Sequence, residues 1–287
     1  AKLKPRLEQM RLRLGLRDAV TPQLRAAVLA YPFVVHPNDQ VFERMAPIFS
    51  KISNPESFHA INMDYPGLEV LHRNPDVFTV KGFLSDEESD RLIAKAKPNM
   101  LQGTRLEQRS PISYSIVNDG ISSEESISHT IGPMTTVRAS GSTLTAVPSV
   151  EIPSVISKLT TLLNVAEEHL EVVKILRYTK GQKFASHHDG FSGPVSQYGF
   201  ANSSRIVTTF CYLNDVEEGG NTFFTWLGID IKPQKGMAVI HFPATKDLVN
   251  DHRTEHGSSL ASGDDKWLLT SWTWKDPQVD RRQYESK

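Results

Sequence analysis

Three side chains in the second half of the chain have the types and spacing of metal ligands. His187 and Asp189 form a His-x-Asp pair, and His256 follows later, directly before Gly257. Residues two apart on a β-strand project from one face, so His187 and Asp189 could point at one centre while His188 points away. Two imidazoles and one carboxylate are typical of non-haem Fe(II) sites, where they leave three coordination positions open. Such a pair also occurs by coincidence on protein surfaces, so its context matters.

A lysine in an apolar run supplies part of that context. Lys266 opens the run Lys-Trp-Leu-Leu, not far beyond His256. A cation in such a strand is costly to bury unless it meets an anion. The distal carboxylate of 2-oxoglutarate would be such an anion. The alternative is an exposed lysine at a strand edge, which we would favour if the three metal-ligand candidates were absent.

Short β-type runs separated by Gly and Pro turns must position these residues. Several strands at this spacing favour a β-sandwich or barrel such as a double-stranded β-helix. We therefore expect a mainly β fold with flanking helices (α+β) and a jelly-roll, cupin-like core. The predicted strands cover residues 77–80, 172–178, 205–213, 221–224, 237–242 and 266–274.

Two helices and a long loop are expected around this core. Ser85 can cap a helix that runs to about Ala96, and Glu88 completes a capping box. Apolar residues at helical spacing predict a second helix over 150–163. Residues 101–135 are polar and weakly periodic, which favours a loop region that could cover a site.

Composition excludes several classes of function. Of 287 residues, 39% are apolar and 23% charged, which is typical of a globular protein. The 32 basic and 33 acidic residues nearly cancel, so no global field favours nucleic acid or an anionic membrane, and no run is apolar enough for a membrane span. A single cysteine, Cys211, excludes an intrachain disulfide and a Cys-rich zinc site, and its place in a strand predicts a buried core residue.

Several motifs in order resemble the prolyl 4-hydroxylase family of Fe(II)/2-oxoglutarate dioxygenases. The resemblance covers roughly residues 75–275. It is carried by Tyr178-x-x-Gly-Gln-Lys-Phe-x-x-His187-x-Asp189, by residues 205–223, by Lys-Pro-Gln-Lys-Gly at 232–236, by His256-Gly257, by Lys266-Trp267, and upstream by residues 83–89 and 138–144.

The resemblance implies a role for each matching residue. His187, Asp189 and His256 would hold Fe(II), while Lys266 would bind the distal carboxylate of 2-oxoglutarate and Tyr178 would hydrogen-bond the same co-substrate. The cofactors implied are Fe(II), 2-oxoglutarate and O2, with ascorbate in support. Decarboxylation of 2-oxoglutarate to succinate and CO2 would accompany oxidation of an unactivated C–H.

The substrate residues are less clear. Arg205 and Trp272 match positions that contact substrate in the family, although a strand-edge arginine and a core tryptophan would also fit. Phe184 stands where the family often has Tyr, and Trp274 where it often has His. These departures put specificity for peptidyl-proline in doubt and leave the reaction class unchanged.

Three functions therefore stay open. The first is a dioxygenase acting on a proline-like or peptidyl-prolyl C–H. The second is an oxidase or oxidative cyclase acting on a free small molecule derived from an amino acid, whose carboxylate Arg205 would pair. The third is a non-catalytic β-sandwich binding module.

The rest of the chain is less informative. Residues 1–70 have no counterpart in the family and predict an N-terminal helical extension, with the dioxygenase domain over 71–287. A secretory compartment and the cytoplasm both stay open, as does the oligomeric state. His129, His169, His241 and His252 receive no role.

Overall fold

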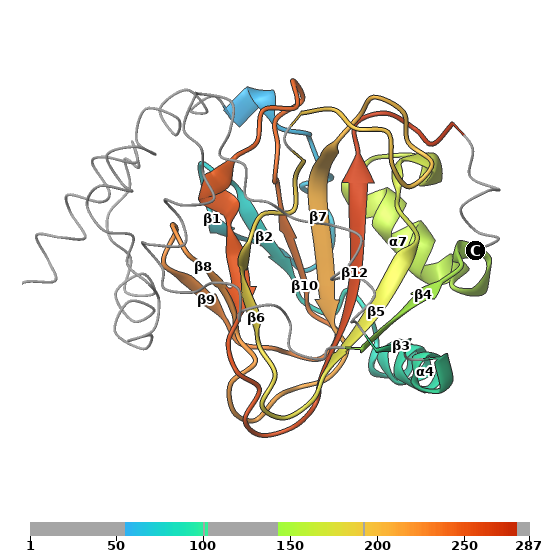
Figure 1. Cartoon of the computed structure of the whole chain (residues 1–287), viewed down its shortest axis with the longest axis vertical. Helices are drawn as coiled ribbons and strands as arrows, with labels where there is room; N and C mark the ends of the chain where they lie inside the picture. The colour runs from blue at the N-terminus through green and yellow to red at the C-terminus, as the bar shows by residue number, and fades with distance from the viewer. Residues whose placement is uncertain (1–54, 100, 103–142, 192, 280–287) are drawn as a thin grey trace, which may run out of the picture.

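The computed structural model describes residues 55–99, 101–102, 143–191 and 193–279 (Figure 1). Most of the predicted N-terminal extension and of the predicted loop over 101–135 lies outside these ranges. No helix within them is long and apolar enough to cross a membrane.

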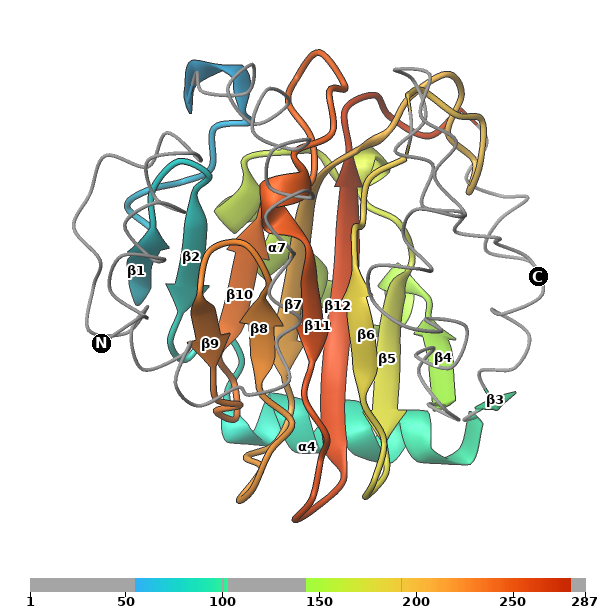
Figure 2. The same ribbon diagram turned by 60° about the vertical axis from the view of Figure 1, so that its left-hand side comes forward.

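Two antiparallel sheets form the core. The larger has the strand order β1-β2-β10-β7-β12-β5-β4-β3 and the smaller β6-β11-β8-β9. From β5 to β8, and again from β9 to β12, the chain alternates between the sheets, which face each other (Figure 2); β8 and β9 are neighbours in the smaller sheet. Eight strands exchanged in this way make a jelly roll, which confirms the predicted double-stranded β-helix. The strands are β1 Leu68–His72, β2 Val77–Val80, β3 Leu101–Gln102, β4 Thr143–Val147, β5 Val173–Tyr178, β6 Phe184–His187, β7 Arg205–Tyr212, β8 Thr222–Phe224, β9 Ile229–Ile231, β10 Ala238–His241, β11 His256–Ser258 and β12 Lys266–Trp274.

The six predicted strands coincide with β2, β5, β7, β8, β10 and β12, within two residues at each end. The predicted strands do not include β1, β3, β4, β6, β9 and β11, of which all but β1 and β4 have four residues or fewer. A run of that length is too short for alternation of apolar and polar residues to show.

Two helices cover the outer face of the larger sheet (Figure 1). The first, α4 (Asp86–Ala96), begins with the predicted capping box: Ser85 Oγ accepts from the Glu88 amide, and the Glu88 side chain accepts from the Ser85 amide. The second, α7 (Pro153–Leu163), starts three residues later than predicted, because Pro153 takes the first helical position after a short 3-10 turn. Its predicted apolar face is buried.

Alternation along β7 divides the core into two parts. Val207 and Cys211 face the helices and belong to a large apolar cluster. Phe210 and Tyr212 face the interior between the sheets and belong to a second cluster. Cys211 is fully buried, as predicted, and burial raises the pKa of its thiol. The inner face, which also carries polar residues of β7 and β12, is where a site can form.

The described residues before β2 belong to this fold. Phe58 and Ile61 are buried in the helix-side cluster, and β1 pairs with β2. The predicted domain boundary at residue 70 therefore falls within β1. The predicted helical extension covers residues 1–70, of which 1–54 lie outside the described ranges.

Candidate active site

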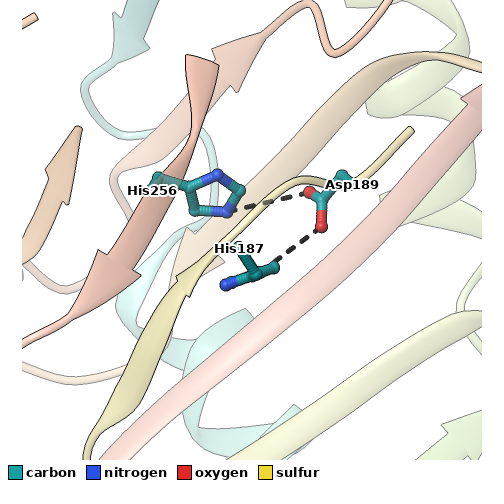
Figure 3. Close-up of side chains that lie close together, drawn as sticks. All are labelled: His187, Asp189 and His256. Atoms are coloured by element: carbon teal, nitrogen blue, oxygen red, sulfur yellow. Dashed lines mark ion pairs between the residues drawn. The ribbon is translucent and has the colours of Figure 1, made fainter. Parts of the chain in front are cut away.

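Strand pairing brings the three candidate metal ligands together (Figure 3). His187 ends β6, and His256 begins β11 directly opposite it in the antiparallel register. The His-x-Asp pattern predicted that Asp189 would lie on the same strand as His187. Asp189 instead lies just beyond the end of β6. His187 Nε2 is 3.4 Å from Asp189 Oδ1, and His256 Nε2 is 3.7 Å from Oδ2. One ligand atom from each residue lies within 4.8 Å of the others, so the three could hold one metal ion.

The protonation states suit a metal. Burial, followed by the neighbouring His187, lowers the pKa of His256 to about 4, so its imidazole is neutral at pH 7. His256 Nδ1 lies 3.1 Å from the Thr254 carbonyl, which can only accept, so Nδ1 carries the proton and Nε2 keeps its lone pair. Burial opposes ionisation of Asp189, yet His256 and His187 hold the pKa of its carboxyl well below the usual range. An anionic carboxylate and a neutral imidazole are the forms that bind metals.

Lys266 is buried on the inner face of β12, with no charged partner in the described part of the chain. Its side chain is 1% exposed, and its Nζ donates to Ser258 Oγ at 2.8 Å. No carboxylate of the described chain lies within 4.0 Å of this Nζ, and burial lowers the pKa of Lys266 to about 7. A buried cation without an anion is the feature that a bound carboxylate would complete. The alternative of an exposed edge lysine is therefore wrong.

Tyr178 lies opposite Lys266 on the neighbouring strand β5. The β12–β5 register places the two residues opposite each other, and Lys266 Nζ lies 5.7 Å from the centre of the Tyr178 ring. Tyr178 is buried, and burial raises the pKa of its phenol, so the hydroxyl stays protonated and can donate. Phe184 lies between this pair and the metal-ligand candidates: its ring centre is 6.4 Å from that of Tyr178 and 4.0 Å from that of His187.

Arg205 is held by a buried carboxylate. Its Nε and one terminal nitrogen donate to Glu171 at 2.6 and 3.0 Å, and its other terminal nitrogen donates to the Asp189 carbonyl at 3.2 Å. Burial opposes ionisation of Glu171, but Arg205 and then Lys174 outweigh it and keep the pKa of its carboxyl low. The guanidinium thus connects Glu171 to the backbone of Asp189. The alternative of a strand-edge arginine is wrong, because β7 lies inside the larger sheet.

The two tryptophans of β12 have different surroundings. Trp272 is half-buried, and the Arg205 guanidinium lies 4.1 Å from the centre of its ring. Trp274 is fully buried, stacks on Phe200 at 4.4 Å, and donates from Nε1 to Glu171 at 2.7 Å. The Trp274 ring is therefore in contact with other side chains of this chain.

Two residues at this site have no role in the sequence analysis. Glu171 precedes the apolar run of β5, and His241 ends the apolar run of β10. Both positions show the pattern that identified Lys266, which is a polar residue beside or within an apolar run. This pattern does not predict which residues Glu171 and His241 contact.

The chain is similar in sequence to proteins of a known family. Residues 173–274 match the family model described as the 2OG-Fe(II) oxygenase superfamily. The chain is 30% identical over 224 residues to prolyl 4-hydroxylase 2 of Arabidopsis thaliana, covering 70% of this chain and 68% of that protein. It is 30% identical over 243 residues to probable prolyl 4-hydroxylase 6 of the same plant, covering 78% and 76%. A solved structure of the viral collagen prolyl hydroxylase vCPH from Paramecium Bursaria Chlorella virus-1, a 2OG complex, aligns with a TM-score of 0.49 and 23% identity, over 69% of this chain and 95% of that one.

Proposed function

Since this chain belongs to the prolyl 4-hydroxylase family of 2OG-Fe(II) oxygenases, we propose that it hydroxylates prolyl residues within a peptide. It is a dioxygenase that uses Fe(II), 2-oxoglutarate and O2. The observation that carries the proposal is Lys266, which is buried with no carboxylate partner among the described residues, in the same jelly-roll interior as the His187, Asp189 and His256 cluster. A metal site and a separate carboxylate site are the two parts that this reaction needs.

We assign the metal to the cluster. His187 and His256 would each offer a neutral nitrogen, and Asp189 an anionic oxygen. Fe(II), when bound there, supplies the O2 chemistry that converts 2-oxoglutarate, O2 and R–H into succinate, CO2 and R–OH. Two other groups of the protein orient these ligands by hydrogen bonds. The Thr254 carbonyl sets the tautomer of His256, and the Thr208 hydroxyl donates to Asp189 Oδ2 at 2.9 Å. Partners of this kind fix the orientation of metal ligands.

We assign the distal carboxylate of 2-oxoglutarate to Lys266, with the Tyr178 hydroxyl as a second donor. Both side chains are buried, so their bonds to a carboxylate form in surroundings of low dielectric.

The affinity for 2-oxoglutarate should depend on pH through Lys266. Its pKa of about 7 without the co-substrate means that half of the lysines must take up a proton on binding at that pH. We expect an affinity that is flat below about pH 6 and falls about tenfold per pH unit above about pH 7.5. Anaerobic calorimetry of the metal-loaded protein, in buffers of different ionisation enthalpy, should show almost no proton uptake at low pH and nearly one proton at about pH 8.5.

A matched pair of variants isolates the lysine. Lys266→Met should weaken 2-oxoglutarate binding by on the order of a hundredfold and abolish the pH slope. Lys235→Met, which removes a lysine whose Nζ pairs with exposed Asp90, should keep both affinity and slope. A wild-type affinity that did not change between pH 6 and pH 8.5, within about twofold, would contradict the role of Lys266.

The surroundings of Arg205 support a prolyl substrate. Phe191, Tyr198 and Trp272 are half-buried, and their ring centres lie 5.1, 5.6 and 4.1 Å from the guanidinium carbon. Aromatic side chains are the usual surface against which proline-rich segments dock. Because Arg205 also donates to the Asp189 backbone, this aromatic surface lies next to the metal-ligand candidates. We assign Trp272 and Arg205 to the wall of the substrate site.

The other two functions lose their main support. The oxidative cyclase required the Arg205 fork to pair with a substrate carboxylate, but Glu171 already occupies that fork. The non-catalytic binding module would be expected to lose a metal ligand or the co-substrate lysine, and the chain keeps all four residues.

Succinate formation tests the substrate class directly. Anaerobically purified protein would receive Fe(II), ascorbate, 2-oxoglutarate and air, with a proline-rich peptide, with free proline- and glutamate-type amino acids, or with neither. We expect stimulation by the peptide and a mass gain of one oxygen on its prolyl residues. Stimulation by free amino acids alone would replace the proposal with small-molecule chemistry, and no turnover with any addition would reject it.

A further inference from the structure

One histidine beside the metal-ligand candidates has no hydrogen-bond partner among the described residues. His241 is fully buried at the end of β10, and within the described part of the chain neither ring nitrogen has a partner. Two phenylalanines and His256 surround it: the ring of Phe224 lies 5.3 Å away, that of Phe210 6.4 Å and that of His256 4.5 Å. Burying an unpaired imidazole is unfavourable, so such a group indicates a partner that the apolar surroundings do not supply.

The nearest acceptor is the Asp189 carboxylate. His241 Nε2 lies 3.7 Å from Asp189 Oδ2, which is longer than a hydrogen bond. The same oxygen already accepts from the Thr208 hydroxyl at 2.9 Å. The β10–β7 register places His241 directly opposite Thr208, so neighbouring strands present two donors to one oxygen.

Coordination of the metal by His241 is the competing possibility. The group whose ligand atoms lie within 4.8 Å of one another contains His187, Asp189 and His256, and His241 is not part of it. Ligand atoms that bind the same ion lie closer to one another than 4.8 Å. The position of His241 therefore favours contact with a ligand over contact with the metal.

We propose that His241 is a positioning residue that donates its Nε2–H to Asp189 Oδ2 in the metal-bound protein. Oδ2 would then be held between Thr208 and His241, and Oδ1, on the side of His187, would be left for the metal. A neutral imidazole with its proton on Nε2 is the form that this role needs. The inference rests on the proposed metal site and adds to it a donor beyond the three ligands.

Metal affinity tests the proposal without turnover. Co(II) would be titrated anaerobically into the whole chain and into His241→Phe, His241→Gln and His241→Asn. Phenylalanine fits the aromatic surroundings and removes both nitrogens. The Gln amide nitrogen can take the place of Nε2, whereas the Asn amide nitrogen takes the place of Nδ1. We expect His241→Phe to weaken Co(II) binding by about ten- to a hundredfold, His241→Gln to restore it to within about threefold, and His241→Asn to resemble His241→Phe.

Two further measurements separate the alternatives. Thermal unfolding of the metal-free variants checks the fold, and we expect no loss of stability in His241→Phe because an unpaired polar group is removed. Pulsed electron paramagnetic resonance on the Cu(II)-loaded protein counts coordinated imidazoles, and we expect two in the wild type and two in His241→Phe.

Each contrary result has a distinct meaning. Unchanged Co(II) affinity in a folded His241→Phe variant would overturn this inference and leave the proposed function standing. Three coordinated imidazoles in the wild type would also overturn it, because His241 would then be a ligand. A wild-type protein that bound no Co(II) would reject the proposed metal site together with this inference.

Discussion

Asp189→Asn should reduce succinate formation by about a thousandfold, equivalent to about 4 kcal/mol of activation free energy. Asparagine keeps the shape of the side chain but removes the only anionic candidate ligand of the cluster. The described residues of that cluster include no other carboxylate that could replace it. Fe(II) binding under anaerobic conditions should weaken in parallel, and addition of metal should raise the thermal stability of the wild type alone.

A surface aspartate provides the matched control. Asp90 has a side chain that is 66% exposed and pairs with Lys235 at 2.8 Å. Asp90→Asn makes the same chemical change where solvent screens the charge, so turnover should stay within about twofold of the wild type. Comparable turnover in Asp189→Asn and Asp90→Asn would show that the cluster is not the site of the reaction.

Glu171→Gln should lower the free energy of unfolding by about 3–5 kcal/mol. The Glu171 side chain is fully buried, and Arg205 and Lys174 both pair with it. Glutamine can still accept from Trp274 Nε1, so packing and that hydrogen bond are kept while the Arg205 charge loses its counter-charge. Urea unfolding of the metal-free protein at pH 7 measures this change directly.

Two variants test that explanation. Glu168→Gln changes an exposed residue of the same segment and should alter the free energy of unfolding by no more than about 0.5 kcal/mol. The double variant Glu171→Gln/Arg205→Met removes both charges and should recover a large part of the loss, because the penalty comes from the unpaired cation. If the double variant were as unstable as the two single changes added together, the ion pair would not be the cause.

The structure also changes how the two departures from the family pattern are understood. Trp274 fills its position with a fully buried ring that donates to Glu171, and Phe184 packs on His187. Neither places a new charge in the site. The site can therefore keep a substrate of the family's class while the walls around it differ.

Local patterns in the chain were sufficient to predict the metal-ligand candidates, the co-substrate lysine and most of the strands. His187 and Asp189 are close in sequence, so their proximity needs no long-range contact, and Lys266 stands out because charge is costly in an apolar run. The capping box of α4 is likewise local, and it was predicted correctly. The family resemblance added the role of Tyr178 and the complete set of cofactors.

Only the tertiary structure decided what the remaining polar residues do. Glu171 lies just before β5, and Arg205 begins β7. The sheet order, with β12 between β5 and β7, places the two side chains 2.6 Å apart. His241 meets Asp189 because β10 pairs with β7 in a register that aligns His241 with Thr208. Sequence periodicity states which face of a strand a side chain takes, but the partner across the sheet depends on strand order and register, and these are set by long-range pairing.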